Sequence, residues 1–313
     1  MRHFDDAGRP FPFLKRPGGK QRLLPKFEEM GLYPEGWLDD DTRAVFVPFM
    51  GGGSATLRYA KTPSGKPRPI FAQDADWDLV NCFSQLRDDP EGFLREVERL
   101  YEGDVREGER FYYGVRSADR DEMWPFPSLY RAARYFYINK TGYNGLWRVN
   151  LKGQCNVAWG KRPFEYDASR LKAVSAYLIE MPVSIVHSHD WHALVGSARA
   201  GDLILMDPPY VPAERQASSF VSYTKEGFDT EDTADLLGLM QTMRDRGVDV
   251  MMTNHGPPWL LESAKRRGLF ITRYAAGRSI SRSAEGRQKV PEIAITNYRP
   301  GQGADLEVAP LTR

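Results

Sequence analysis

Short apolar runs, each stopped by polar, glycine or proline residues, recur along the chain and predict the strands of a buried sheet. They span residues 44–47, 69–73, 183–186, 203–206, 248–253, 270–274 and 293–298. Helices are expected over residues 54–60, 128–137 and 230–246. Strands that alternate with helices in this way indicate an open α/β fold.

The order of these runs predicts one domain that is interrupted by another. Two strands precede residue 75, and the next convincing strand begins only at residue 183. A crossover between parallel strands does not need so long a connection. We therefore expect a catalytic domain formed by residues 1–78 and 166–313, with an inserted unit at 79–165. Within that unit, residues 151–157 are typical of a β-hairpin that turns at Gly153.

Positive charge is concentrated in the predicted insertion. No Asp or Glu occurs between residues 130 and 164, where aromatic residues alternate with basic ones. The basic residues are Arg131, Arg134, Lys140, Arg148, Lys152, Lys161 and Arg162. Two further basic clusters lie within residues 9–26 and 273–289, although the net charge is only +1. Interleaved cations and aromatic rings suit a polyanion with stackable bases, which predicts a nucleic-acid partner.

Other features of the sequence exclude several classes of protein. No apolar run is long enough for a membrane helix, and the amino terminus does not resemble a signal peptide. The two cysteines, Cys82 and Cys155, cannot form a disulfide framework or a four-cysteine zinc site. The three histidines within residues 187–192 are interpreted as surface or pocket residues. We expect a cytoplasmic protein with neither a metal site nor a membrane partner.

The segment Asp207-Pro208-Pro209-Tyr210 follows the apolar run 203–206 directly. A buried strand that stops at Asp-Pro-Pro predicts a rigid turn at the carboxyl edge of the sheet, where open α/β folds bind ligands. The Asp carboxylate and a proline carbonyl can accept both N–H groups of an exocyclic amine, while the Tyr ring stacks on a flat base. These four residues are the predicted catalytic residues.

A glycine-rich loop, Pro48–Ser54, connects the first predicted strand to the first helix. Glycines there let the backbone approach a ligand closely. Asp74 ends the next strand and suits the hydroxyls of a ribose. A dinucleotide oxidoreductase is the rival interpretation, but Thr56 stands where G-x-G-x-x-G needs its third glycine. The loop and the acid predict a cofactor site beside the amine site.

These motifs stand in the order found in a known family, which the chain resembles from about Phe13 to Tyr298. The family is that of Dam-like, D12-class DNA adenine-N6 methyltransferases, in which a target-recognition domain lies between cofactor loop and catalytic loop. The matching segments are 13–20, 48–54, 139–150, 153–157, 207–210, 220–224 and 289–292. The resemblance implies a Rossmann-like S-adenosylmethionine-dependent methyltransferase sheet with helices on both faces, plus an inserted, mostly helical target-recognition domain with a β-hairpin.

The resemblance also implies roles for individual residues. S-adenosylmethionine would be held by residues from five segments of the chain. They are Lys20, Phe49, Gly51, Gly52, Gly53, Ser54, Asp74, Asp190, Trp191 and Asp207. Among them, Asp74 would meet the ribose, and Asp190 and Trp191 the adenine of the cofactor. Arg16 stands where relatives usually carry Trp, and Ala158 replaces a Pro.

The DNA contacts implied by the resemblance come mostly from the acid-free segment. They are Lys15, Lys140, Tyr143, Asn144, Leu146, Arg148, Asn150, Lys152 and Lys161. Lys15, Leu146 and Arg148 match positions that read bases in relatives specific for GATC. Tyr143 and Asn144 match residues beside the gap that a flipped base leaves, whereas Lys140 and Lys152 are expected to meet phosphates.

The sequence thus predicts an adenine-specific DNA methyltransferase, EC 2.1.1.72, that acts on double-stranded DNA at GATC or a related short palindrome, as a monomer or weak dimer. It is either a solitary enzyme or part of a restriction-modification pair. Two alternatives stay open: an N4-cytosine methyltransferase, since cytosine also has an exocyclic amine, and a DNA-binding relative that has lost catalysis.

Overall fold

A computed structural model describes residues 3–16, 18–38, 43–121, 129–210, 228–274 and 292–301, together with the backbone of residues 306–307. Several predicted features lie outside these ranges. They are Pro17, Ser128, the matching segment 220–224, and the basic residues Arg278, Arg282, Arg287 and Lys289.

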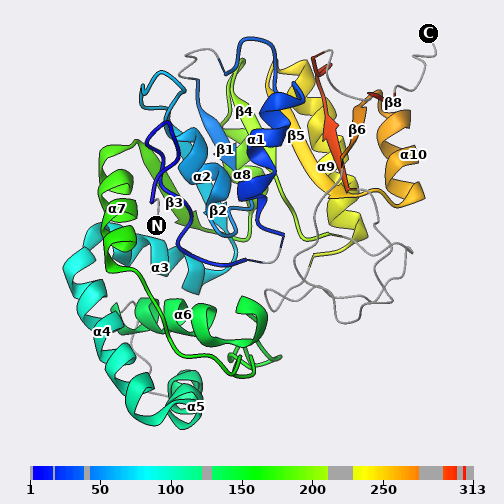
Figure 1. The fold of residues 1–313 in the computed structure, drawn as a ribbon. Coiled ribbons are helices and arrows are strands. Elements are labelled where there is room, and N and C mark those ends of the chain that lie inside the picture. Colours follow the sequence, from blue (N-terminus) through cyan, green and yellow to red (C-terminus); the bar gives the residue numbers. More distant parts are fainter. Residues whose placement is uncertain are drawn as a thin grey trace.

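The described strands form one eight-stranded sheet in the order β3-β2-β1-β4-β5-β7-β6-β8 (Figure 1). The strands are β1 (Val45–Val47), β2 (Ile70–Asp74), β3 (Val183–His187), β4 (Leu203–Met206), β5 (Asp249–His255), β6 (Phe270–Tyr274), β7 (Glu292–Thr296) and β8 (Leu306–Glu307). The first five are parallel neighbours, and β7 pairs antiparallel with both β5 and β6. The seven predicted strands are confirmed to within about two residues, and the antiparallel edge was not predicted.

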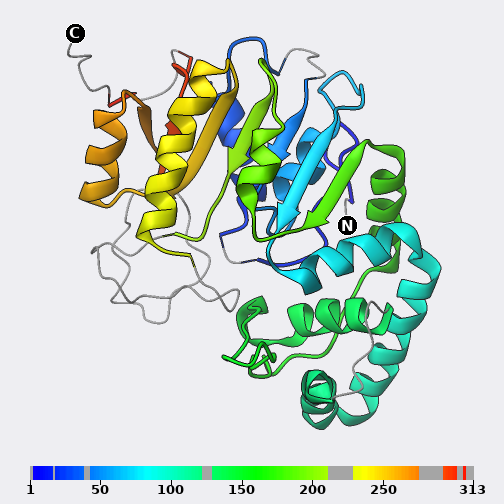
Figure 2. The same ribbon diagram turned by 180° about the vertical axis from the view of Figure 1, so that it is seen from behind.

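Helices cover both faces of this sheet, as Figures 1 and 2 show from opposite sides. The helices of the sheet layers are α1 (Leu24–Glu29), α2 (Ser54–Tyr59), α7 (Ala168–Glu180), α8 (Trp191–Gly196), α9 (Thr230–Asp245) and α10 (Pro258–Arg266). Successive strand residues point to opposite faces: Val45 and Val47 join one buried cluster with α2 and α7, whereas Phe46 joins another with α8 and α9. This arrangement confirms the predicted fold class.

The connection from β2 to β3 is helical and lies beyond the carboxyl ends of the parallel strands, whose arrows point toward it in Figure 2. It contains α3 (Trp77–Asp88), α4 (Pro90–Glu107), α5 (Glu109–Ser117) and α6 (Leu129–Thr141). Side chains of α3, α6 and the sheet belong to one buried cluster, so these helices share a core with the strands. The boundaries at residues 79 and 165 stay a prediction.

A hairpin-like turn follows α6, close to where the sequence predicted one. Val149 and Cys155 form an isolated antiparallel bridge, and Gly153 occupies the turn with φ +77°. The N–H of Cys155 donates to Oδ2 of Asp119 at 2.7 Å, and the Tyr112 hydroxyl donates to the Val157 carbonyl at 3.1 Å. The hairpin is therefore held against the end of α5.

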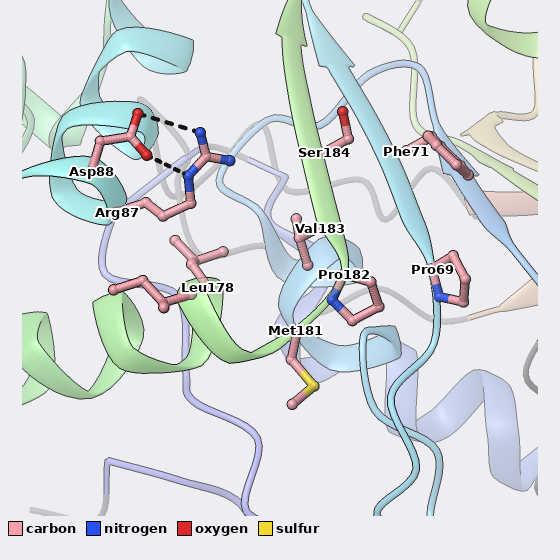
Figure 3. Close-up of a pocket in the computed structure, with 10 residues that line it drawn as sticks. Pro69, Phe71, Arg87, Asp88, Leu178, Met181, Pro182, Val183 and Ser184 are labelled. Atoms are coloured by element: carbon pink, nitrogen blue, oxygen red, sulfur yellow. Dashed lines mark hydrogen bonds and ion pairs between the residues drawn. The ribbon is translucent and has the colours of Figure 1, made fainter.

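A hollow of about 570 Å³ lies near the other end of the parallel strands (Figure 3). Its lining includes Pro69 and Pro182, which precede β2 and β3. Because ligand sites of open α/β sheets lie at the carboxyl ends of strands, this hollow is separate from the predicted site. Among the residues that the structure describes, none of the helices could span a membrane.

Candidate active site

Asp207 stands at the carboxyl end of β4 and is held by two neighbouring groups. The Lys20 ammonium lies 2.9 Å from Oδ1 of Asp207, and the Thr253 hydroxyl donates to the same oxygen at 2.6 Å. The Asp207 side chain remains about one-third exposed, whereas that of Lys20 is buried. The carboxylate is therefore fixed from behind and still open to an incoming donor.

The Lys20 ammonium uses its three donors within the protein. It also donates to the Tyr210 hydroxyl at 2.7 Å and to the Gly18 carbonyl at 3.0 Å. An ammonium group has only three N–H donors, and these contacts tie the amino-terminal segment to the Asp207 loop. The contact of Lys20 with a cofactor stays a prediction.

Tyr210 is held as firmly as Asp207. Its hydroxyl donates to Oε2 of Glu292 at 3.1 Å, and its ring lies edge-on to His255 with 4.6 Å between centroids. Burial raises the pKa of Tyr210 far above its ordinary value, and the negative charge of Asp207 adds to the effect. The hydroxyl therefore stays protonated and donates a hydrogen bond at neutral pH.

The glycine loop is attached to the end of β2. The N–H of Met50 donates to the Gln73 carbonyl, and the N–H of Gly51 donates to Oδ2 of Asp74, both at 2.8 Å. Gly53 has φ +77°, and a Cβ there would lie 2.7 Å from the ring of Phe83. Only glycine fits that position, so the loop presents bare backbone beside Asp74.

Asp74 and Asp76 link the loop to the inserted helices. The N–H of Asp76 donates to Oδ1 of Asp74 at 2.9 Å, so both Asp74 oxygens already accept one hydrogen bond. Asp76 is buried, and its Oδ2 accepts from Arg16 at 2.6 Å and from the Tyr135 hydroxyl of α6 at 3.1 Å. Burial raises the pKa of Asp76 to about 6, although the Arg16 charge opposes the shift.

The predicted adenine-binding pair lies at the next strand end. Asp190 is the N-cap of α8, where its Oδ1 accepts from the N–H groups of His192 and Ala193 at 3.0 and 3.2 Å. Trp191 is buried, with its ring centroid 6.4 Å from that of Phe49. The structure thus brings Phe49, Asp74 and this pair to neighbouring strand ends, and Asp190 also has a purely structural use.

The predicted DNA residues near α6 are fixed through Asn139. Its side chain accepts from the Lys15 N–H at 2.8 Å and donates to the Lys15 carbonyl at 2.6 Å. Its amide also donates to the Gly145 carbonyl at 3.3 Å. Lys15 and Tyr143 are exposed, and Asn144 takes a left-handed conformation with φ 56°. One buried amide therefore sets the spacing between Lys15 and the Tyr143–Gly145 turn.

Among the residues near the hairpin that are predicted to bind DNA, the cations are exposed, whereas Asn150 has a structural role. Arg148 is exposed, and its Nε donates to Oδ1 of Asn156 at 2.7 Å. Oδ1 of Asn150 accepts from the N–H groups of Lys152 and Gln154 at 2.9 and 3.0 Å, so it stabilises the turn. Lys152 and Lys161 are exposed, and Leu146 is half-buried.

The Lys140 side chain, predicted to contact a phosphate, binds within the protein in this structure. Its ammonium donates to the Phe13 carbonyl and lies 5.1 Å from the centroid of the Phe136 ring. Burial lowers its pKa to about 7, and the positive charge of Lys15 adds to the effect. The ammonium is thus directed into the protein in this structure, and the phosphate contact of Lys140 stays a prediction.

Sequence reasoning assigned no role to several residues that the structure places at the site. They are Asp76, Tyr135, Asn139, Thr253, Tyr274 and Glu292. Thr253 lies two residues before the end of β5, and Glu292 is the first residue of β7. No group of three His, Cys, Asp or Glu side chains that could hold a metal occurs among the described residues.

Comparison with known proteins gives a consistent result. The D12 class N6 adenine-specific DNA methyltransferase family matches residues 17–276. The chain is 34% identical over 92% of its length to the type II methyltransferase M1.LlaDCHI of Lactococcus lactis subsp. cremoris, and covers 95% of that protein. It is 28% identical to the DNA adenine methylase of Escherichia coli K12, covering 92% of this chain and 95% of that one. Among solved structures, the rRNA methyltransferase aviRa of Streptomyces viridochromogenes is only weakly similar, with a TM-score of 0.40 and 15% identity over 95% of this chain and 93% of that one.

Proposed function

Because the chain belongs to the D12 class N6 adenine-specific DNA methyltransferase family, we propose that it methylates N6 of an adenine flipped out of duplex DNA, within GATC or a related short palindrome. The family defines it as an adenine-specific DNA methyltransferase, EC 2.1.1.72. The methyl donor in this proposal is S-adenosylmethionine, and the protein acts as a monomer or weak dimer.

The observation that carries the proposal is the support of Asp207 by Lys20 and Thr253 at the carboxyl end of β4. In a turn with only a structural role, one carboxylate oxygen would not need both the buried Lys20 ammonium and the Thr253 hydroxyl as partners. The arrangement keeps that carboxylate fixed and partly exposed, beside the glycine loop. It suits a group that must receive a neutral amine in one orientation.

The residues of the strand ends also fit S-adenosylmethionine. A Cβ at Gly51 would enter open space, Asp74 offers acceptors to ribose hydroxyls, and Phe49 with Trp191 supplies apolar surface for a purine. When bound, S-adenosylmethionine supplies an electrophilic methyl group on a positively charged sulfur. The chain itself has to orient and activate the acceptor.

The amine of adenine is a weak nucleophile because its lone pair is delocalised into the ring. In our proposal the Asp207 carboxylate and the Pro208 carbonyl accept its two N–H bonds and favour a nitrogen with a localised lone pair. The Tyr210 ring stacks on the base and sets its plane. As the nitrogen becomes positive, Asp207 stabilises the charge, so orientation and electrostatics provide most of the rate.

A paired adenine hides its amine inside the duplex, so the base has to leave the stack at a cost of a few kcal/mol. We propose that Tyr143 and Asn144, on the turn fixed by Asn139, border the gap that the base leaves. Arg148 and Lys15 would meet base edges, and Lys152 and Lys161 would meet phosphates. Long-read mapping of modified adenines in a plasmid treated with the pure protein tests this proposal, and methylated adenines without a common short sequence would contradict it.

Replacement of Asp74 with alanine is expected to weaken S-adenosylmethionine binding by about 1.5–3 kcal/mol, because hydrogen bonds to a charged group are lost. The variant also loses the acceptor of the Gly51 N–H. Isothermal titration calorimetry measures the change. Asp88→Ala removes an exposed carboxylate of α3 that pairs with Arg87, and serves as the matched control. Equal affinities of the two variants would place the ribose contact elsewhere.

Replacement of Arg148 with alanine is expected to cost about 1–3 kcal/mol of discrimination at one base pair, as for loss of a bidentate Arg–guanine contact. In the structure, Nε and Nη2 of Arg148 donate to Asn156 at 2.7 and 3.3 Å, so Asn156 holds one edge of the guanidinium. Methylation rates on GATC and on each single-base variant measure the effect. The matched change Lys152→Ala should weaken binding to all sequences and flatten the salt dependence. A uniform loss in Arg148→Ala would show that Arg148 positions DNA without reading it.

A further inference from the structure

Two tyrosine hydroxyls converge on one oxygen of Glu292. Tyr210 donates to Oε2 at 3.1 Å, and Tyr274 donates to the same atom at 2.9 Å. Neither Glu292 nor Tyr274 belongs to the loops that carry the proposed chemistry. Their contact with the Tyr210 hydroxyl nevertheless places them directly behind the catalytic loop.

Strand register explains why these groups meet. Glu292, the first residue of β7, lies opposite His255 of β5 and opposite Tyr274 of β6. Directly opposed residues of antiparallel strands point to the same face of a sheet. His255 contacts the Tyr210 ring, so three neighbouring strands present one residue each toward Tyr210. The antiparallel edge of the sheet thus supports the loop after β4.

The Tyr210 hydroxyl is held from two sides. It accepts a hydrogen bond from the Lys20 ammonium at 2.7 Å and donates one to Glu292. Tyr274 is itself buried, with its ring 4.8 Å from that of Phe27. Because Tyr274 is fixed in the core, its hydroxyl holds the Glu292 carboxylate in place. The Tyr210 ring therefore has one orientation in which all of its hydrogen bonds are made.

The charges agree with this geometry. Lys20 faces the Asp207 carboxylate directly and the Glu292 carboxylate through the Tyr210 hydroxyl. Burial raises the pKa of Tyr274 far above its ordinary value, and the Glu292 charge adds to the effect, so Tyr274 remains a donor. A carboxylate that accepts from two hydroxyls is an anchor for both of them.

We infer that Glu292 is a positioning residue that fixes the plane of the Tyr210 ring through the Tyr210 hydroxyl. The inference rests on the proposed function, in which that ring stacks on the target base. When the Tyr210 ring is fixed, the base stacked on it keeps its exocyclic amine beside the Asp207 carboxylate. When the ring tilts, the amine moves away from that carboxylate. Glu292 touches neither the base nor the methyl donor in this account. Its effect should therefore appear in the methyl-transfer step and not in the binding of either ligand.

A double-mutant cycle on the whole protein tests the inference. Glu292→Met, which removes the acceptor, should lower the single-turnover rate of methyl transfer by about 10²-fold, as expected when a reacting group is misplaced by about 1 Å. Glu292→Gln keeps an acceptor of the same size and should lower the rate by less. Tyr210→Phe removes the hydroxyl itself. In the Tyr210→Phe background, Glu292→Met should change the rate by less than about twofold, because coupled residues are not additive.

The controls separate positioning from a general structural role. Dissociation constants for S-adenosylmethionine and for a DNA duplex should stay within about twofold of the parent values in all Glu292 variants. Glu262→Gln, on the exposed face of α10, should match the parent in both rate and binding. If Glu292→Met does not fold, the Gln variant provides the cycle. Additive rate losses, or a loss confined to ligand binding, would overturn the inference alone. No methyl transfer by the unaltered protein would overturn the proposed function, and this inference with it.

Discussion

Asp207→Ala is expected to lower the rate of methyl transfer by about 10³-fold, the scale of losing a preorganised group that stabilises transition-state charge. In the proposed mechanism its carboxylate accepts the N–H of the target amine and faces the positive charge that develops on nitrogen. The group is already fixed by Lys20 and Thr253. Its loss should therefore remove an interaction that no neighbouring side chain can replace.

Folding and DNA binding should survive that change. Lys20 keeps its hydrogen bonds to the Tyr210 hydroxyl and the Gly18 carbonyl, so its ammonium is not left unpaired. Transfer of tritium from labelled S-adenosylmethionine to DNA measures the rate, and thermal unfolding checks the fold. Asp245→Ala, at the exposed end of α9, provides the matched control. A rate for Asp207→Ala within tenfold of the parent would remove Asp207 from the mechanism.

Arg134→Met is expected to destabilise the protein by about 3–5 kcal/mol, the usual result of breaking a buried ion pair by removing one partner. The Arg134 side chain is only 1% exposed and lies 2.8 Å from Oδ2 of Asp119. Its Nε also donates to the Val115 carbonyl at 2.8 Å. Because Asp119 holds the hairpin through the Cys155 N–H, the change should loosen the segment that carries Arg148.

Urea-induced unfolding followed by circular dichroism measures this loss. Arg99→Met is the matched control, because the Arg99 side chain is 75% exposed and pairs with Glu96 on the surface of α4. Exposed pairs contribute about 0–1 kcal/mol, so the control should unfold close to the parent. Equal stability of the two variants would mean that Arg134 makes no net contribution to the hairpin support.

The strands and the placement of the central site could be predicted from sequence, since both depend on local patterns. An apolar run followed by Asp207-Pro208 specifies a strand and its end, and the Gly51–Gly53 loop specifies a close backbone approach. The supports of these loops could not be predicted in the same way. Thr253 and Glu292 act through strand register between segments far apart in the chain, which no local pattern encodes.

The basic residues give a second example of what the sequence could not predict. The acid-free segment indicated where polyanion-binding charge would be concentrated, but it could not tell exposed cations from buried ones. Arg134 binds carbonyl groups and Asp119 inside the inserted helices, and Lys140 binds the Phe13 carbonyl. Arg134 and Lys140 both lie on α6, and tertiary packing determines which face of that helix is buried. Composition therefore predicted the partner better than the individual contacts.

Nucleoside analysis of DNA after incubation with the pure protein and S-adenosylmethionine tests the central claim most directly. A plasmid free of modified bases is treated, digested to nucleosides and separated by liquid chromatography with mass detection. The account predicts N6-methyladenine in the treated DNA, formed about 10³-fold more slowly when the protein carries Asp207→Ala. N4-methylcytosine in its place, or unmodified DNA with the unaltered protein, would contradict it.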